Sequence, residues 1–172
     1  MPDDPLSLKR CFPPVVDANT RVLILGSLPG EVSLAQSQYY ANRQNRFWHL
    51  LGDILGTNLA GMDYPLRLQK LLAHRVGLWD VVAEARREGS LDSSIRDHAG
   101  NDLTGLVDSL PSLAAIAFNG GTAARIGMKA LAGHGDRHPV LTLPSSSPAY
   151  TLAYAEKLAA WRALEAWLEP AA

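Results

Sequence analysis

The chain has 172 residues, of which 47% are hydrophobic and 19% are charged. This length suits one domain with a sizeable core, and the composition excludes an intrinsically disordered chain. The formal net charge of −1 excludes a protein that binds nucleic acid through overall basic charge, so a site for a polyanion has to be a local patch.

The cysteine content and the N-terminal segment exclude further classes of protein. A single cysteine, Cys11, excludes a disulfide framework and a cysteine-ligated zinc or iron–sulfur centre within one chain. The sequence has no run of about 18 apolar residues, the length that a membrane-spanning helix needs. Its first segment, "MPDDPLSLKR", is acidic and lacks the apolar centre of a signal peptide. We therefore expect a cytoplasmic protein that forms one domain over residues 1–172, with residues 1–20 as an extended arm.

Short apolar runs predict buried strands, and apolar residues at spacings of three and four predict helices. In chain order we expect a strand at 21–26, a loop at 27–44, helices at 45–55 and 64–75, a strand at 76–82, a polar irregular segment at 87–102, a helix at 103–110, a strand at 113–120, a helix at 121–131, a loop at 133–138, a strand at 139–144 and a C-terminal helix opened by "SSSPAYTL". Strands that alternate with helices predict an α/β fold, in which a parallel sheet is covered on both faces.

Three polar segments follow predicted strands, and we expect them to meet at one edge of the sheet. They are "GSLPG" after the first strand, "FNGG" after the third and "LPSSSPAY" after the fourth. In a parallel sheet, ligands bind beyond the carboxyl ends of the strands. The spacing of Gly26 and Gly30 fits neither a dinucleotide fingerprint nor a phosphate-binding loop, and no hydrolase elbow is present.

The polar residues of these segments each have a structural explanation beside a functional one. The serines at 145–147, before Pro148, fit a helix cap with a polar turn, or a phosphate site strengthened by the dipole of the following helix. Tyr39 and Tyr40 fit packing, or stacking on a flat ligand. The side chains that fit caps or turns when taken alone are those of Asn42, Asn45, Asp80 and Asn119.

Taken together, the motifs resemble the uracil-DNA glycosylase superfamily. "GSLPG" is followed by "YYANRQNRFW", then by "GLWDVV" with "GSLDSSI", then by "AFNGG" and "LPSSSPAY", in the order of that family over roughly residues 12–165. The sequence is most similar to the mismatch-specific members, and above all to the hypoxanthine (deoxyinosine) DNA glycosylases. The resemblance implies a three-layer α/β/α sandwich around a four-stranded parallel sheet.

The resemblance also implies chemistry on a base that is rotated out of DNA. The C–N glycosidic bond is hydrolysed through an oxocarbenium-like sugar, and no metal or redox cofactor takes part. Ser145, Ser146 and Ser147 match the motif that grips the DNA backbone, and Tyr40 takes the place of the aromatic platform for the base. The other residues expected to bind the base are Gly26, Ser27, Leu28, Pro29, Gly30, Asp80 and Asn119.

One departure from the family concerns the catalytic water. Many relatives carry Asn or Asp where this chain has Leu28, and a leucine side chain cannot hold water. The hypoxanthine branch relies on an asparagine of the "NRFW" segment, which is Asn45 here, with Asn42 as the second choice. An amide aligns water without deprotonating it, so we expect a modest rate and a good leaving group.

Two further sets of residues are candidates for contact with DNA. Ser147 or Ala149 stands where some relatives carry an intercalating side chain. The side chains expected to form a local positive rim, or else an ordinary solvated surface, are Arg43, Arg46, Arg137 and His138.

Three functions remain open at this point. The first is a monomeric, monofunctional DNA glycosylase for hypoxanthine, with DNA as its partner and no contact with a membrane. The second is excision of uracil or thymine from mismatches. The third is a catalytically silent module that binds nucleic acid.

Overall fold

The computed structural model describes residues 8–86, 96–132 and 137–168. The "GSLDSSI" segment of the sequence analysis lies outside these described residues. In chain order the elements are β1 (Leu8–Arg10), β2 (Val22–Gly26), α1 (Glu31–Gln36), α2 (Phe47–Leu55), the 3-10 helix η1 (Leu59–Gly61), α3 (Tyr64–Ala73), β3 (Val76–Asp80), β4 (Val82–Arg86), β5 (Arg96–Gly100), α4 (Leu103–Asp108), β6 (Ala115–Asn119), α5 (Gly121–Ala130), β7 (Val140–Leu143), α6 (Tyr154–Trp161) and the 3-10 helix η3 (Arg162–Ala166).

A four-stranded parallel sheet in the order β3-β2-β6-β7 forms the centre of the molecule. Successive side chains of β2 point to opposite faces, and both sets are buried. Val22 and Ile24 belong to a core cluster with α2, α3 and α6, whereas Leu23 and Leu25 belong to one with α4 and α5. An apolar run without polar alternation therefore identifies a strand that is buried on both faces.

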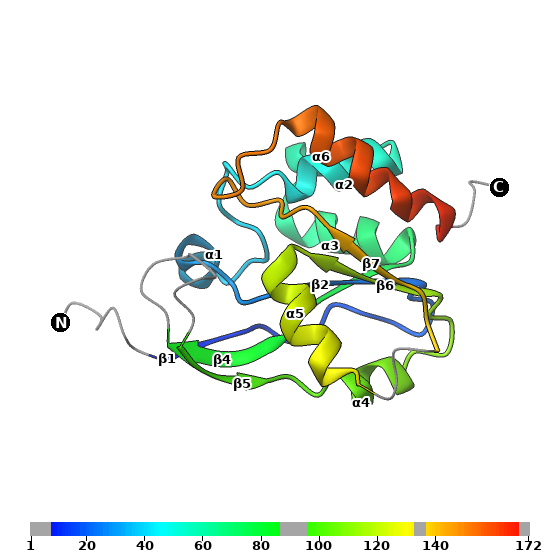
Figure 1. Ribbon diagram of the computed structural model, residues 1–172. Coiled ribbons are helices and arrows are strands. Elements are labelled where there is room, and N and C mark those ends of the chain that lie inside the picture. The colour runs from blue at the N-terminus through cyan, green and yellow to red at the C-terminus, as the bar shows by residue number, and fades with distance from the viewer. Residues whose placement is uncertain (1–7, 87–95, 133–136, 169–172) are drawn as a thin grey trace.

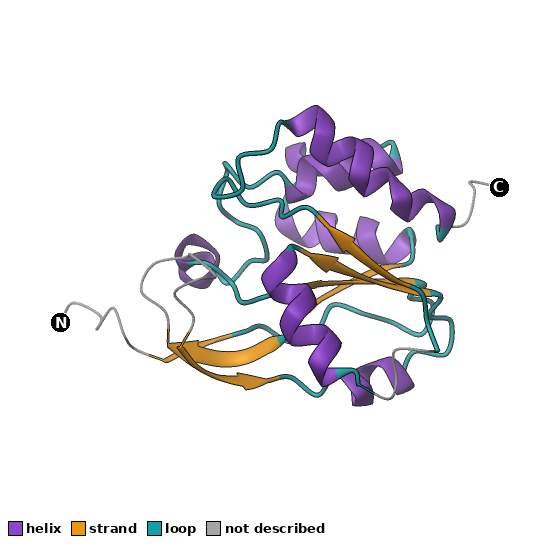
Figure 2. Ribbon diagram, in the orientation of Figure 1, coloured by secondary structure: helices purple, strands orange, loops and turns teal. Residues whose placement is uncertain are grey.

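Helices cover both faces of this sheet, as Figures 1 and 2 show, with α2, α3 and α6 on one side and α4 and α5 on the other. Helix α2 buries Phe47, Leu50 and Leu51 on one face, as the spacing predicts, and ends at Gly56, whose φ of 69° is left-handed. The predicted α/β/α sandwich with four parallel strands is confirmed. None of the described helices has the length and apolarity to cross a membrane.

A second, smaller sheet was not predicted. β1, β4 and β5 form three antiparallel strands in the order β1-β4-β5. The strand expected at 76–82 forms as β3 but ends at Asp80, and the chain then starts β4 at Val82 where a loop was expected. The irregular segment expected at 87–102 was wrong where β5 forms, because the strand pairs with a distant partner and local pattern gives little sign of it.

Two loops also differ from expectation. The loop at 27–44 contains the short helix α1, which ends at Ser37 in a left-handed conformation (φ 53°). The C-terminal helix begins at Tyr154 and not at Pro148. The Ser146 carbonyl accepts a hydrogen bond from the Arg46 backbone N–H, and the Ser147 carbonyl accepts from Lys157 Nζ and from the Tyr150 N–H, which closes a single turn that does not continue as a helix. No helix dipole therefore starts at the serines.

Candidate active site

The carboxyl ends of β2, β3, β6 and β7 surround a cavity of about 750 Å³. Its volume lies in the range of small-molecule sites, roughly 300–1,000 Å³. The structure brings every site residue predicted from the sequence to the wall of this cavity: Gly26, Ser27, Leu28, Pro29, Gly30, Tyr40, Asn42, Asn45, Asp80, Asn119, Ser145, Ser146 and Ser147.

Gly26 ends β2 where two polar groups crowd the backbone. A Cβ atom at this position would lie 2.7 Å from Asp80 Oδ1 and 2.8 Å from the Tyr40 hydroxyl oxygen. Both distances are shorter than real Cβ contacts, so glycine is required here for steric reasons and not for its φ. Asp80 itself is only 3% exposed, which places a carboxylate deep at the end of β3.

Tyr40 is held in a fixed orientation. Its ring stacks on Phe47, with centroids 3.8 Å apart and an angle of 15° between the planes. Its hydroxyl accepts a hydrogen bond from Asn119 Nδ2 at 3.3 Å. Its φ of 55° is left-handed, which is uncommon for a residue with a large side chain. The stack and the hydrogen bond hold this backbone conformation, so the ring is preorganised at the cavity wall.

The neighbouring Tyr39 serves packing. It is 3% exposed, its ring meets Phe12 edge-on at 5.1 Å, and its hydroxyl donates to the carbonyl of Pro13 at 3.1 Å. Burial, together with the nearby Asp80 charge, raises the pKa of the Tyr39 phenol well above its ordinary value.

Asn119 joins three segments that are distant in sequence. Its Nδ2 donates to Ser146 Oγ at 2.8 Å as well as to Tyr40, and its Oδ1 accepts from the Ser146 backbone N–H at 2.9 Å. Asn119 is 7% exposed and Ser146 is fully buried. The carboxamide therefore fixes the serine segment and the Tyr40 loop relative to β6.

Asn45 and Asn42 line the cavity and also act as turn residues. Asn45 Oδ1 accepts from the Phe47 backbone N–H at 3.0 Å, and Asn42 Oδ1 accepts from the Gln44 N–H at 2.9 Å. Each carbonyl oxygen has a second lone pair, so this role leaves room for another donor. Among the described residues, the Nδ2 groups of Asn42 and Asn45 make no hydrogen bond, so none holds either carboxamide away from the cavity.

We call residues Ser145–Tyr150 the serine loop. Within it, the Ser147 N–H donates to Ser145 Oγ at 3.1 Å, and the Ala149 N–H donates to Ser147 Oγ at 3.2 Å. Helix α6 supports it from behind, since Trp161 Nε1 donates to the Pro144 carbonyl at 2.8 Å.

Sequence reasoning missed Lys157, which donates to the Ser147 carbonyl at 3.0 Å and is 3% exposed. Burial and then the charge of Arg46 lower its pKa. The signal was present in the sequence, because Lys157 interrupts the apolar stripe of Tyr154, Leu158 and Trp161 on the C-terminal helix.

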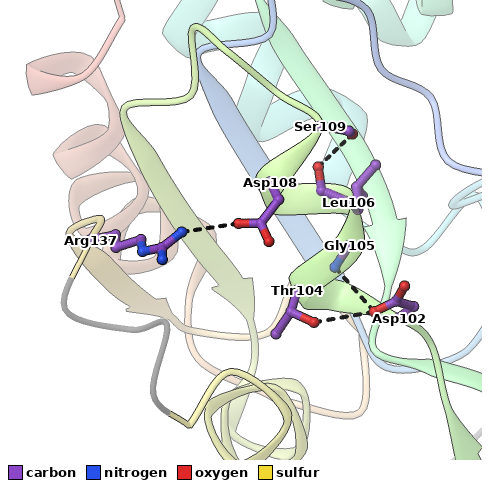
Figure 3. A network of polar contacts seen from close by, with 7 residues as sticks. All are labelled: Asp102, Thr104, Gly105, Leu106, Asp108, Ser109 and Arg137. Carbon is purple, nitrogen blue, oxygen red and sulfur yellow. Dashed lines mark hydrogen bonds and ion pairs between the residues drawn. The ribbon is translucent and has the colours of Figure 1, made fainter.

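Of the four side chains expected to form a positive rim, Arg137 and His138 lie away from the cavity, whereas Arg46 adjoins Ser146 at its wall. Arg137 pairs with Asp108 at 3.2 Å beside α4, as Figure 3 shows. With His138 it precedes β7, so both lie toward the amino edge of the sheet, away from the cavity. Arg43 lines an adjoining cavity of about 440 Å³. Among the described residues, Arg125 of α5 is the cation that lines the main cavity, and it was not among the predicted site residues.

One family profile and two named relatives match this chain. The profile of the family described as "Uracil DNA glycosylase superfamily" matches residues 13–169. The chain is 46% identical over 142 residues to a protein of Methanosarcina acetivorans named "Hypoxanthine DNA glycosylase", covering 83% of this chain and 88% of the relative. It is 47% identical over 112 residues to a protein of the same name from Methanosarcina barkeri, covering 65% and 71%.

A solved structure of similar sequence has the same fold as this chain. The solution NMR structure of a candidate uracil DNA glycosylase from Methanosarcina acetivorans superposes with a TM-score of 0.79 at 44% sequence identity. The match covers 92% of this chain and 99% of that structure. The resemblance read from the motifs is thereby confirmed, and the chain belongs to the uracil DNA glycosylase superfamily.

Proposed function

We propose that this protein is a DNA glycosylase that removes hypoxanthine, the deaminated form of adenine, from DNA. The relatives named for that activity support the choice of base. The observation that carries the proposal is the cavity at the carboxyl edge, where the glycine segment after β2, the Tyr40 ring, the Asn45 amide and the serine loop meet.

The reaction is hydrolysis of the bond between the sugar C1′ and the base nitrogen. The base departs with the bonding electron pair and takes up a proton, while the oxygen of water forms the new bond to C1′. The transition state carries positive charge on the sugar. Asn45 holds the water on the open face of C1′ through its carboxamide oxygen, with Asn42 as the alternative. Because an amide does not deprotonate water, the rate depends on the quality of the leaving base.

The base itself is held by stacking and by its hydrogen-bonding edge. Tyr40, backed by Phe47, provides a flat platform whose stacking on a base is worth about 1–3 kcal/mol. Hypoxanthine presents an N–H donor beside a carbonyl acceptor. The buried Asp80 carboxylate supplies an acceptor for such a donor at the end of β3. Asn119 contributes by fixing Tyr40 and the serine loop, which grips the DNA backbone through Ser145 and Ser147.

A second candidate, excision of uracil or of mismatched thymine, is favoured by the likeness to the uracil DNA glycosylase structure. Single-turnover assays on duplexes that carry hypoxanthine, uracil, mismatched thymine or xanthine separate the two. We expect the hypoxanthine duplex to react fastest. Faster release of uracil would replace our proposal by the second one, and binding without release of any base would indicate the silent module.

We further propose that the enzyme acts as a monomer in the cytoplasm. Light scattering coupled to size-exclusion chromatography tests whether the protein is a monomer. A molecular mass near the 18.6 kDa of one chain is expected.

A further inference from the structure

Lys157 is a buried cation without an anionic partner. It is 3% exposed, and among the residues that the structure describes no carboxylate forms an ion pair with it. Its ammonium donates to the Ser147 carbonyl at 3.0 Å and lies 5.6 Å from the centroid of the Tyr150 ring. Both of these partners belong to the serine loop.

The charged groups around Lys157 do not neutralise it. Its neighbour Arg46 is a second cation, whose backbone N–H donates to the Ser146 carbonyl at 3.0 Å. Glu156, the next residue on α6, is exposed. Asp53 of α2 accepts a hydrogen bond from Tyr154. Behind the serine loop, Lys157 therefore has no described carboxylate paired to it, and the Ser147 carbonyl is turned toward its ammonium while the Ser146 carbonyl is turned toward the Arg46 backbone.

Such an arrangement costs stability. Removing an ammonium from water without a counter-ion is unfavourable, and an apolar side chain of similar volume in its place is often neutral or stabilising. A group that opposes folding and stands behind a cavity wall is typical of a functional site, where stability is given up for activity. A DNA phosphate is the anion that this position lacks. Tyr150 is 49% exposed and lines the cavity, so the loop that Lys157 contacts is open to solvent on the cavity side.

We propose that Lys157 is a positioning residue for DNA binding: it holds the serine loop by the Ser147 carbonyl and the Tyr150 ring, and its uncompensated charge attracts a backbone phosphate to that loop. The inference rests on the proposed function, because it assumes that the loop grips DNA. It adds a residue outside the sequence motifs and a phosphate site that spans the loop and α6.

The test compares Lys157→Met with the wild type in binding to a duplex that contains an uncleavable abasic-site analogue, measured over a range of salt concentrations. We expect binding at low salt to weaken about 10- to 100-fold, as for the loss of one hydrogen bond to a charged group. We expect the slope of log K against log salt to become shallower by about 0.7–0.9, which is the loss of one phosphate contact. The melting temperature stays equal or rises.

Two further variants separate this role from a purely structural one. Lys157→Arg keeps the charge and is expected to restore most of the affinity and of the salt slope. Lys129→Met removes an exposed lysine at the end of α5 and is expected to leave both unchanged. In excision assays, Lys157→Met raises KM by a larger factor than it lowers kcat.

Failure of this inference is distinguishable from failure of the proposed function. A folded Lys157→Met protein with wild-type affinity and salt slope overturns it. The inference is also overturned if the Lys157→Met protein is less stable and its KM rises by the same factor as its kcat falls, since that result indicates a purely structural lysine. Binding to the abasic analogue does not depend on which base is excised. A wild type that binds the analogue but releases no hypoxanthine therefore refutes the proposed function alone.

Discussion

Two regions of this molecule use the same kinds of polar side chain in opposite ways. Around α4, the bonds that cap the helix join residues two or three positions apart (Figure 3): Asp102 Oδ1 accepts from the Gly105 N–H at 3.0 Å and from Thr104 Oγ1 at 3.2 Å. Ser109 Oγ donates to the Leu106 carbonyl at 2.7 Å. These groups are exposed, and they cap one short helix.

At the cavity the bonds cross the fold. Asn119 reaches Ser146, 27 positions away, and Tyr40, 79 positions away, and the groups concerned are buried or partly buried. A local cap stabilises only its own helix, whereas a buried long-range bond sets the relative positions of separate loops. The comparison predicts that variants at α4 change stability slightly and leave catalysis intact, while variants at the cavity change catalysis most.

The largest effect is expected for Asn45→Ala. Losing the group that positions water should lower the single-turnover rate on a hypoxanthine duplex by roughly 10²- to 10³-fold, in the range found for a lost transition-state hydrogen bond. Asn58→Ala is the matched control, because Asn58 Oδ1 likewise accepts a local backbone N–H bond, from Gly61 at 3.2 Å, but Asn58 does not line the cavity. A wild-type rate for Asn45→Ala would assign the water to another residue.

A smaller effect is expected for Gly26→Ala. The new methyl group would push on Asp80 Oδ1 and on the Tyr40 hydroxyl, which should destabilise the fold by about 1–3 kcal/mol. Displacement of the reacting groups should lower the rate by about 10²-fold. Gly100→Ala on β5 is the control, since its nearest neighbour would be the Val81 carbonyl oxygen at 3.8 Å. Equal rates for the two variants would contradict the role given to Gly26.

Asn119→Ala and Asp102→Ala compare a buried long-range bond at the cavity with an exposed local cap at α4. It leaves the buried Ser146 N–H without its acceptor, which should cost about 1–3 kcal/mol in chemical denaturation. Asp102→Ala removes a helix cap and should cost about 0.5–2 kcal/mol. Only Asn119→Ala is expected to slow excision as well. If Asp102→Ala slows excision as much, then the two regions do not differ in the way described.

The sequence predicted the central sheet well, because strands buried on both faces leave a continuous apolar run such as "VLIL" at residues 22–25. It also predicted the cavity residues, because parallel topology brings the segments after β2, β6 and β7 to one edge. β5 was not predicted, since the pairing partner and not the local pattern determines it. The helix expected from Pro148 was wrong, because Lys157 and Arg46 hold the carbonyls that a helix would use.

The sequence also misjudged the positive charges. Arg137 was expected beside DNA, but its position before β7 places it near α4, where it pairs with Asp108. Lys157 interrupts the apolar stripe of the C-terminal helix, but a lysine on a helix is ordinarily solvated, so the stripe alone does not predict that this lysine is buried.

The most direct measurement is NMR of the ¹⁵N-labelled protein during titration with a duplex that contains an abasic-site analogue. The account predicts that the amide signals of the non-proline residues in 26–30, 40–45 and 145–150 shift, while those of residues 102–109 stay in place. Shifts confined to α4 with an unchanged cavity would contradict it.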